Sequence, residues 1–228
     1  MVDLKVLVEK AISAVELREE EFVAPVLRRA GASLFELLVA VILTQNTSDR
    51  NAFRAYYNLK GAVGEITPQA LLALGEERLA ELIKPAGMNR IRARNLIELS
   101  RRVLDVDLNS VRDMPVDEAR AFLKSLPGVG DKTADVILVN LGRPAFPVDT
   151  HITRIAMRWG IGKRYEEISK WFLANFPPDR YLEVHLKLIQ FGRDYCKARA
   201  PRCGGCPVRD LCPWPGKINA TPGTQRRP

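Results

Sequence analysis

The sequence predicts an all-α protein from three observations. Apolar residues recur at three- and four-residue spacing along most of the chain, which is the period of an amphipathic helix. No segment alternates apolar and polar residues between hairpin turns, so strands are not expected. Glycines stand where the helical patterns break, as at helix ends and turns: Gly87, Gly128, Gly130, Gly142 and Gly160.

Capping signals and periodicity place the individual helices. Ser33 with Glu36 forms a capping box ahead of an apolar run that continues to Leu43. Thr67-Pro68 combines an N-cap with a first-turn proline and opens a helix over residues 69–74. Periodicity predicts the other helices over residues 48–59, 79–84, 91–106, 116–123, 132–141, 151–159, 165–176 and 180–192.

The composition indicates a globular protein with a polyanionic partner. With 228 residues, 46% of them hydrophobic, the chain can bury one large core or two modest ones. Its formal charge of +8 favours binding to phosphates, since each neutralised phosphate releases condensed counterions. The longest apolar run, Leu37 to Leu43, is too short to span a bilayer, and MVDLKVLVEK does not resemble an export signal. We expect a soluble, cytoplasmic protein without a membrane partner, associated with the nucleoid if the source is prokaryotic.

Basic residues concentrate toward the end of the chain. From Arg193 onward there are eight basic residues and two acidic ones, a local excess of six positive charges. Lys197, Arg199 and Arg202 lie between the first two cysteines. We expect this loop to contact phosphate, and the alternative is an ordinary solvated loop.

The four cysteines of the chain form one short array. Cys196, Cys203, Cys206 and Cys212 have the spacing C-x6-C-x2-C-x5-C, which lets a single loop direct four thiolates toward one centre. Two disulfides would need an oxidising compartment and usually a small, core-poor domain, and the sequence indicates neither. The array therefore predicts a metal centre, either zinc or an iron–sulfur cluster.

The segment LPGVG, residues 126–130, joins two expected helices. Its two glycines let the backbone approach another molecule closely and present N–H groups to an anion, although an ordinary inter-helix turn can have the same sequence. Lys132 follows in the first turn of the next helix, where the helix dipole disfavours its protonated form. Lys132 is therefore a candidate nucleophile, and the alternative is an exposed charge.

Asp149 lies just before the helix expected from His151 and is predicted to cap it. A carboxylate opposite Lys132 can also accept its proton and stabilise positive charge on a sugar ring. His151 is expected to make a local hydrogen bond, and His185 to occupy a packing position in a helix.

Three motifs together resemble the endonuclease III family, within the helix-hairpin-helix superfamily of DNA glycosylases. LPGVGDKTADVIL, VDTHITRI and the cysteine array occur in that family's order, and the resemblance runs from about Leu34 to Cys212. It implies a six-helix barrel domain over residues 27–144, with the helix-hairpin-helix motif at about 120–142. It further implies a discontinuous iron–sulfur cluster domain, residues 1–26 and 145–213, and a flexible tail, 214–228.

The resemblance also assigns chemistry to particular residues. It implies a 4Fe-4S cluster on the four cysteines. It implies that Lys132 attacks C1′ of the damaged nucleotide, releases the base and forms a Schiff base that permits β-elimination, with Asp149 assisting. The partner would be double-stranded DNA containing damaged bases or abasic sites, bound by a monomer.

Further DNA contacts follow by resemblance. The hairpin residues Gly128, Val129 and Gly130 would grip the backbone. Asn46 stands in the place of a family glutamine that fills the gap left by the flipped base, and Gln45 precedes it as the alternative.

Met88 matches an apolar residue that enters the opposite strand, and the alternative is a core methionine. The arginines that follow it, Arg90, Arg92 and Arg94, would contact phosphates or form a solvated helix face.

Three functions remain open at this point. The first is a bifunctional glycosylase and abasic-site lyase acting on oxidised pyrimidines. The second is a mismatch glycosylase that removes thymine, uracil or adenine. The third is a non-catalytic DNA-binding module, against which the presence of both Lys132 and Asp149 argues.

Overall fold

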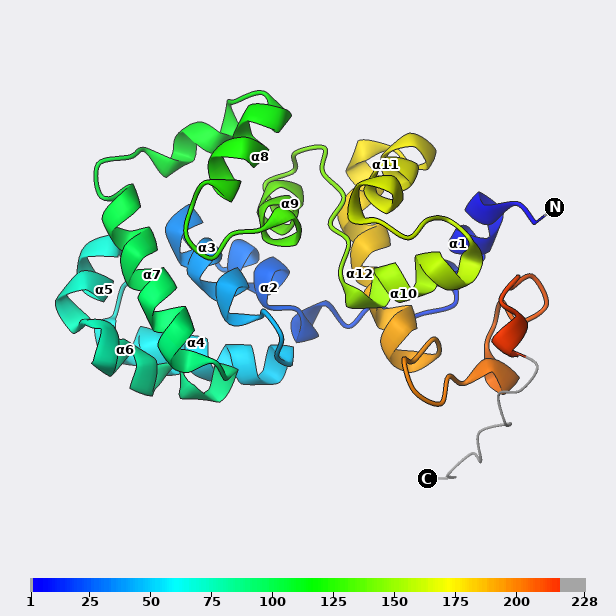
Figure 1. The fold of residues 1–228 in the computed structure, drawn as a ribbon, viewed down its shortest axis with the longest axis horizontal. Coiled ribbons are helices and arrows are strands. Elements are labelled where there is room, and N and C mark those ends of the chain that lie inside the picture. The colour runs from blue at the N-terminus through cyan, green and yellow to red at the C-terminus, as the bar shows by residue number, and fades with distance from the viewer. Residues whose placement is uncertain (1, 218–228) are drawn as a thin grey trace. The chain divides into compact units, whose positions relative to one another are not determined.

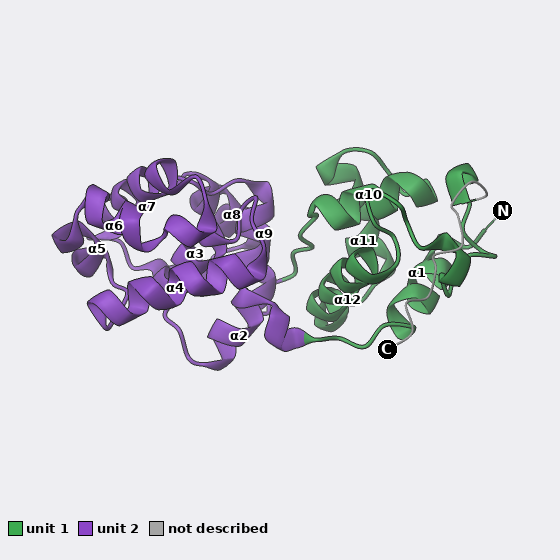
Figure 2. Cartoon of the chain, turned by 90° about the horizontal axis from the view of Figure 1, so that it is seen from below, with its two compact units in different colours: residues 1–18, 144–228 green, residues 19–143 purple. Residues whose placement is uncertain are grey.

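The computed structural model of the chain describes residues 2–217, and within them it contains helices and loops but no strand (Figure 1). The predicted all-α class is therefore confirmed. The chain divides into two compact units, coloured separately in Figure 2. Unit 2 spans Glu19–Arg143, and unit 1 combines Met1–Arg18 with the chain from Pro144 onward. None of the described helices has both the length and the apolar composition needed to cross a membrane.

Unit 2 is built around α3 (Leu34–Leu43), whose residues are all buried. A helix that is apolar almost throughout must be surrounded, and α3, whose one charged residue is Glu36, packs against α2, α4, α7 and α9. The other helices of the unit are α2 (Val23–Arg29), α4 (Asp49–Val63), α5 (Pro68–Leu74), α6 (Glu76–Leu82), α7 (Asn89–Val103), α8 (Val116–Lys124) and α9 (Asp131–Asn140). Short 3-10 helices lie at η1 (Glu19–Glu21), η2 (Lys84–Ala86) and η3 (Leu108–Arg112).

The predicted capping box of α3 is only half formed. The Ser33 hydroxyl accepts the N–H of Glu36 at 3.1 Å, as expected of an N-cap. The Glu36 carboxylate, however, accepts hydrogen bonds from the Tyr56 hydroxyl and the Lys60 ammonium, each at 2.6 Å. Glu36 therefore joins α3 to α4 instead of closing the box.

Unit 1 packs α1 (Leu4–Ser13) against α12 (Tyr181–Asp194), together with α10 (Thr150–Trp159) and α11 (Tyr165–Asn175). Its core contains Phe146 stacked on Phe172, with ring centroids 4.2 Å apart. Short 3-10 helices lie at η4 (Pro178–Arg180), η5 (Cys203–Gly205) and η6 (Pro215–Lys217).

Two helices, α1 and α2, were not predicted. The signals of α1 are local: Asp3 caps it, and its buried residues Leu7, Val8, Ala11 and Ile12 have helical spacing. α2 has only seven residues and a proline in its first turn, so its periodic signal is weak.

The tail predicted from residue 214 is partly held in place. The Arg158 guanidinium lies over the ring of Trp214, 4.2 Å from its centroid, and η6 follows directly. The remaining predicted tail, residues 218–228, lies outside the described residues.

Candidate functional site

The turn between α8 and α9 places two glycines in different roles. Gly128 has a φ of +78°, a conformation that L side chains rarely adopt, so the turn favours glycine there for its backbone conformation. Gly130 is the N-cap of α9, and Val129 between them is buried. The backbone N–H groups of the first turn of α9 thus follow a short glycine-containing turn, a geometry suited to an anion.

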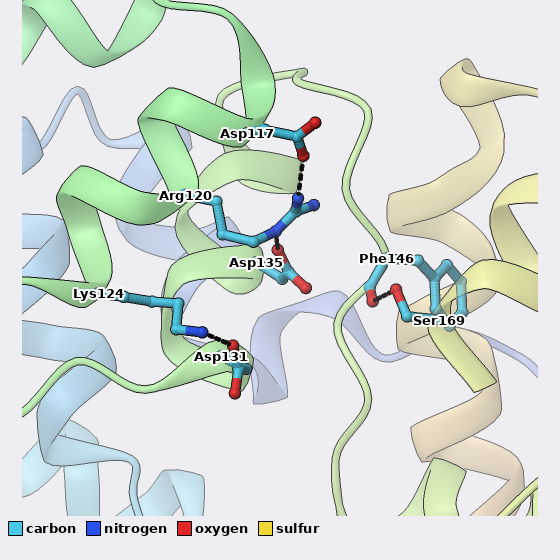
Figure 3. Close-up of polar contacts among 7 residues, drawn as sticks. All are labelled: Asp117, Arg120, Lys124, Asp131, Asp135, Phe146 and Ser169. Atoms are coloured by element: carbon cyan, nitrogen blue, oxygen red, sulfur yellow. Dashed lines mark hydrogen bonds and ion pairs between the residues drawn. The ribbon is translucent and has the colours of Figure 1, made fainter. Parts of the chain in front are cut away.

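Ion pairs join the two helices of this hairpin (Figure 3). Arg120 of α8 donates from Nε to the Asp135 carboxylate of α9 at 2.7 Å, and Asp135 is only 1% exposed. Arg120 also donates to Asp117 at 2.8 Å. Lys124 pairs with Asp131 nearer the turn. The hairpin is therefore clamped once in the interior and once at the surface.

Lys132 is the second residue of α9, in the first turn as the sequence predicts, and it is half-exposed. From Thr133 to Asn140 the rest of α9 is buried, which fixes the helix that carries the lysine. A half-exposed amine on a rigid helix can reach a bound molecule without moving the backbone.

Asp149 is the N-cap of α10, which confirms its predicted structural role. Its Oδ1 accepts the N–H of Ile152 at 2.8 Å. A residue of α12 holds the segment that precedes Asp149: the buried His185 donates from Nδ1 to the carbonyl of Pro147 at 3.0 Å. The cap uses one carboxylate oxygen, so Oδ2 lies outside it.

The two histidines have the structural roles expected of them. His151 contacts the Arg154 guanidinium through Nδ1 at 3.0 Å, and burial lowers the pKa of His151. His185 lies edge-on to the ring of Phe146 in the core of unit 1.

The two candidate wedge residues of unit 2 share an unusual backbone conformation. Asn46 has a φ of +52° and Met88 a φ of +48°, and both residues are exposed, Met88 at 55%. The alternative of a core methionine is therefore wrong. Among residues 2–217 the only other non-glycine residue with positive φ is Ala200, between the first two cysteines. Such conformations cost free energy and concentrate at functional sites.

The side chain of Gln45 is engaged in hydrogen bonds within the protein, whereas Asn46 is exposed. The Gln45 side-chain amide donates to the carbonyl of Gly128 at 2.8 Å and to the hydroxyl of Thr133 at 3.1 Å. Both bonds lie within unit 2 and join the end of α3 to the hairpin.

One of the three arginines after Met88 departs from both alternatives. Arg92 is 4% exposed and donates to backbone carbonyls, so it forms neither a phosphate contact nor a solvated face. Arg92 stands at helical spacing from the buried residues Leu96 and Leu99 of α7. This spacing is visible in the sequence and indicates that Arg92 lies on the buried face of the helix. Arg90 and Arg94 are exposed, and Arg94 lies 3.7 Å from the carboxylate of Glu76.

The four cysteines lie in one half-buried segment of unit 1 and are all free thiols. Burial, together with the neighbouring cysteines, raises the pKa of Cys206 to about 11. The Arg158 guanidinium donates to Sγ of Cys196 at 3.1 Å. In the described chain no three His, Cys, Asp or Glu side chains are already arranged as metal ligands. Four thiols in one short segment, one of them facing an arginine, are nevertheless a donor set suited to an iron–sulfur cluster.

Two arginines of α10 hold the cysteine segment, and sequence reasoning did not identify them. Arg154 donates from Nε to the carbonyl of Cys196 at 2.8 Å, and Arg158 donates to the carbonyl of Lys197 at 2.9 Å. Their spacing of four residues on one helix is a signal that could have been read. Arg199 and Arg202, further along the loop, are exposed.

Comparisons with known proteins agree with these features. Residues 39–178 match the HhH-GPD superfamily base excision DNA repair protein family, and residues 196–212 match the iron-sulfur binding domain of endonuclease III. The chain is 35% identical to endonuclease III of Sulfolobus acidocaldarius over 203 residues, covering 87% of this chain and 90% of that protein. It is 38% identical to endonuclease III of Escherichia coli strain K12, covering 82% and 87%.

Solved structures with the same fold include DNA complexes. A trapped endonuclease III-DNA covalent intermediate, an estranged-adenine complex, matches with a TM-score of 0.69 and 34% identity, over 79% of this chain and 84% of that one. A thermostable thymine-DNA glycosylase matches with a TM-score of 0.69 at 21% identity, covering 92% and 94%, which shows a shared fold alone. The chain therefore belongs to the endonuclease III family of HhH-GPD base excision DNA repair proteins and carries that family's iron–sulfur binding domain.

Proposed function

We propose that this base excision repair glycosylase and abasic-site lyase removes oxidised pyrimidines from duplex DNA, with Lys132 as its nucleophile. The observation that carries the proposal is the position of Lys132, half-exposed on the first turn of α9 directly after the hairpin. A phosphate held at the hairpin N–H groups would bring a sugar within reach of that amine. The relatives named endonuclease III, one of them in a trapped covalent complex with DNA, support the same chemistry.

The reaction begins with the damaged nucleotide turned out of the duplex. Lys132, as a neutral amine, attacks C1′ of the sugar, and the bond from C1′ to the base breaks, so that the base leaves with the electron pair and gains a proton. Opening of the sugar ring then breaks the C1′–O4′ bond and leaves an imine between Lys132 and C1′. Loss of a proton from C2′ expels the 3′ phosphate by β-elimination, and water finally hydrolyses the imine.

Asp149 is proposed to assist this reaction. Its Oδ1 is engaged in capping α10, so the carboxylate is fixed, and Oδ2 lies outside the cap. A fixed carboxylate can accept the proton of the Lys132 ammonium and stabilise positive charge that develops on the sugar.

The hairpin, the two wedge residues and the basic loop are further proposed to bind the DNA. Gly128, Val129 and Gly130 grip a phosphate through the backbone, without reading bases. The exposed Asn46 fills the gap left by the flipped base, while Met88 enters the opposite strand.

The loop that contains Lys197, Arg199 and Arg202 contacts the phosphate backbone. We propose that the protein acts as a monomer in the cytoplasm, at the nucleoid if the source is prokaryotic.

We propose Cys196, Cys203, Cys206 and Cys212 as the ligands of the 4Fe-4S cluster. Four cysteine ligands leave the cluster no open coordination position, so it would supply structure and not catalysis. Arg154 and Arg158 hold the backbone carbonyls of Cys196 and Lys197 and would thereby orient the basic loop.

A base-release assay tests the proposed function. Duplexes would carry an oxidised pyrimidine, a uracil or thymine opposite guanine, or a mismatched adenine, and both the free base and the cut strand would be measured. We expect the oxidised pyrimidine to be released fastest, with strand cleavage. Faster release of thymine, uracil or adenine would indicate a mismatch glycosylase, and salt-sensitive binding without release would indicate a DNA-binding module.

A further inference from the structure

The side chain of Arg92 joins two segments that are distant in sequence. It donates from Nε to the carbonyl of Gly87 at 2.8 Å and from Nη1 to the carbonyl of Ile42 at 2.6 Å. Its Nη2 donates to the carbonyl of Gln45 and, at 3.3 Å, to that of Ala86. Ile42 lies in the last turn of α3 and Gln45 two residues beyond that helix, while Ala86 ends η2 and Gly87 follows it before α7.

Each of those segments leads directly to a proposed wedge residue. Asn46 follows Gln45, and Met88 follows Gly87. Both wedge residues have positive φ, a conformation that persists only when its surroundings determine it. The fork of a buried guanidinium can satisfy several carbonyls at fixed angles, which a lysine at the same place could not.

Gln45 extends the connection to the hairpin. Its backbone carbonyl accepts from Arg92, and its side-chain amide donates to the carbonyl of Gly128 and the hydroxyl of Thr133. Thr133 is the neighbour of Lys132 on α9. A continuous run of hydrogen bonds therefore leads from the Met88 turn through Arg92 and Gln45 to the helix that carries the proposed nucleophile.

We infer that Arg92 and Gln45 are positioning residues that set both wedges and the hairpin in one fixed arrangement. This inference rests on the proposed function, because it gives the wedges and Lys132 a common task. Base flipping needs both wedges to enter the duplex while the amine reaches C1′. A misplacement of about 1 Å at such a site costs about 10²-fold in rate. Gln45 thus acts through the hairpin and does not itself fill the gap in the DNA.

The first test compares Arg92→Met with Arg101→Met. Both variants lose one positive charge from α7, but Arg101 is exposed and pairs only with nearby Glu98 in the described chain. Base release would be measured in single turnover with saturating enzyme, on a duplex with 2-aminopurine opposite the lesion to report unstacking. We expect release by Arg92→Met to fall about 10²-fold, with a reduced 2-aminopurine signal. Arg101→Met should stay within about threefold of wild type.

Two further variants keep the test decisive if Arg92→Met folds poorly. Gln45→Leu and Thr133→Val each remove part of the connection to the hairpin and leave the Arg92 guanidinium in place. Both should slow release while binding of undamaged duplex stays within about threefold. Wild-type rates in folded Gln45→Leu and Thr133→Val would overturn the inference.

Amide hydrogen exchange of the DNA-free protein separates this inference from the proposed function. In Gln45→Leu, we expect faster exchange at residues 44–48 and 126–130 than in wild type. Unchanged exchange there would overturn the inference even if the enzyme releases oxidised pyrimidines. If exchange is faster in Gln45→Leu but the wild-type protein releases no base, the proposed function would be contradicted. The inferred hydrogen-bonded connection through Gln45 would still stand.

Discussion

The interior ion pair of the hairpin gives a prediction whose magnitude follows from the structure. In Arg120→Met, the carboxylate of Asp135 would lose its ion pair with Arg120 while its side chain is only 2% exposed. Removing one partner of a buried ion pair costs about 3–5 kcal/mol, and we take about 3 because the Arg120 side chain is 24% exposed. For a protein of this size that free energy lowers Tm by about 6–12 °C.

Lys124→Met provides the matched control on the same helix. The pair of Lys124 with Asp131 is at the surface, with side chains 43% and 50% exposed. Such pairs contribute at most about 1 kcal/mol, so Tm should fall by no more than about 4 °C. Thermal unfolding followed by circular dichroism measures both variants. Equal shifts in the two would refute the assignment of hairpin stability to the interior pair.

Three other predictions concern unit 1. Burial lowers the pKa of His151 from its usual value near 6.5. As the pH drops below about 7, the unfolded chain therefore binds a proton at His151 before the folded protein does, and the free energy of unfolding decreases. His151→Gln should flatten this fall in urea unfolding between pH 7.5 and 5.5, and an unchanged slope would contradict it. Arg158→Met should destabilise the cysteine segment by about 2–3 kcal/mol, because it removes the Arg158 contacts with Cys196 and Lys197. The visible absorbance of the iron–sulfur centre should then be lost faster than in wild type. Loss at the wild-type rate would refute this prediction. Replacing Arg199 and Arg202 by serine should reduce the slope of log K against log salt by about 1.8 for duplex DNA, and an unchanged slope would exclude phosphate contacts from both.

The fold was predictable where its signals are local. Ser33 and Asp149 cap their helices through bonds to residues three positions away, so their roles can be read from short stretches of sequence. The run from Leu34 to Leu43 is apolar except for Glu36, and it forms the buried centre of unit 2. The position of Lys132 in the first turn of α9 follows from the glycines before it.

The residues that the sequence did not explain act over long distances in the chain. Arg92 bonds to a carbonyl 50 residues away, and Gln45 bonds to one 83 residues away. Nothing within a short window distinguishes such an arginine from a surface charge except its place on the apolar face of α7. Glu36 is similar, because its contacts with Tyr56 and Lys60 depend on how α4 packs. Tertiary contacts decided each of these cases.

Reductive trapping tests the central claim most directly. Borohydride would be added to the protein with a duplex that contains an oxidised pyrimidine, and the covalent complex would be measured by gel electrophoresis. We predict a trapped complex for the wild-type protein and none for Lys132→Ala, because reduction fixes the imine to the residue that formed it. Lys163→Ala, which changes a lysine outside the proposed site, should trap as wild type does. A trapped complex with Lys132→Ala, or none with the wild-type protein, would contradict the assignment of Lys132 as the nucleophile.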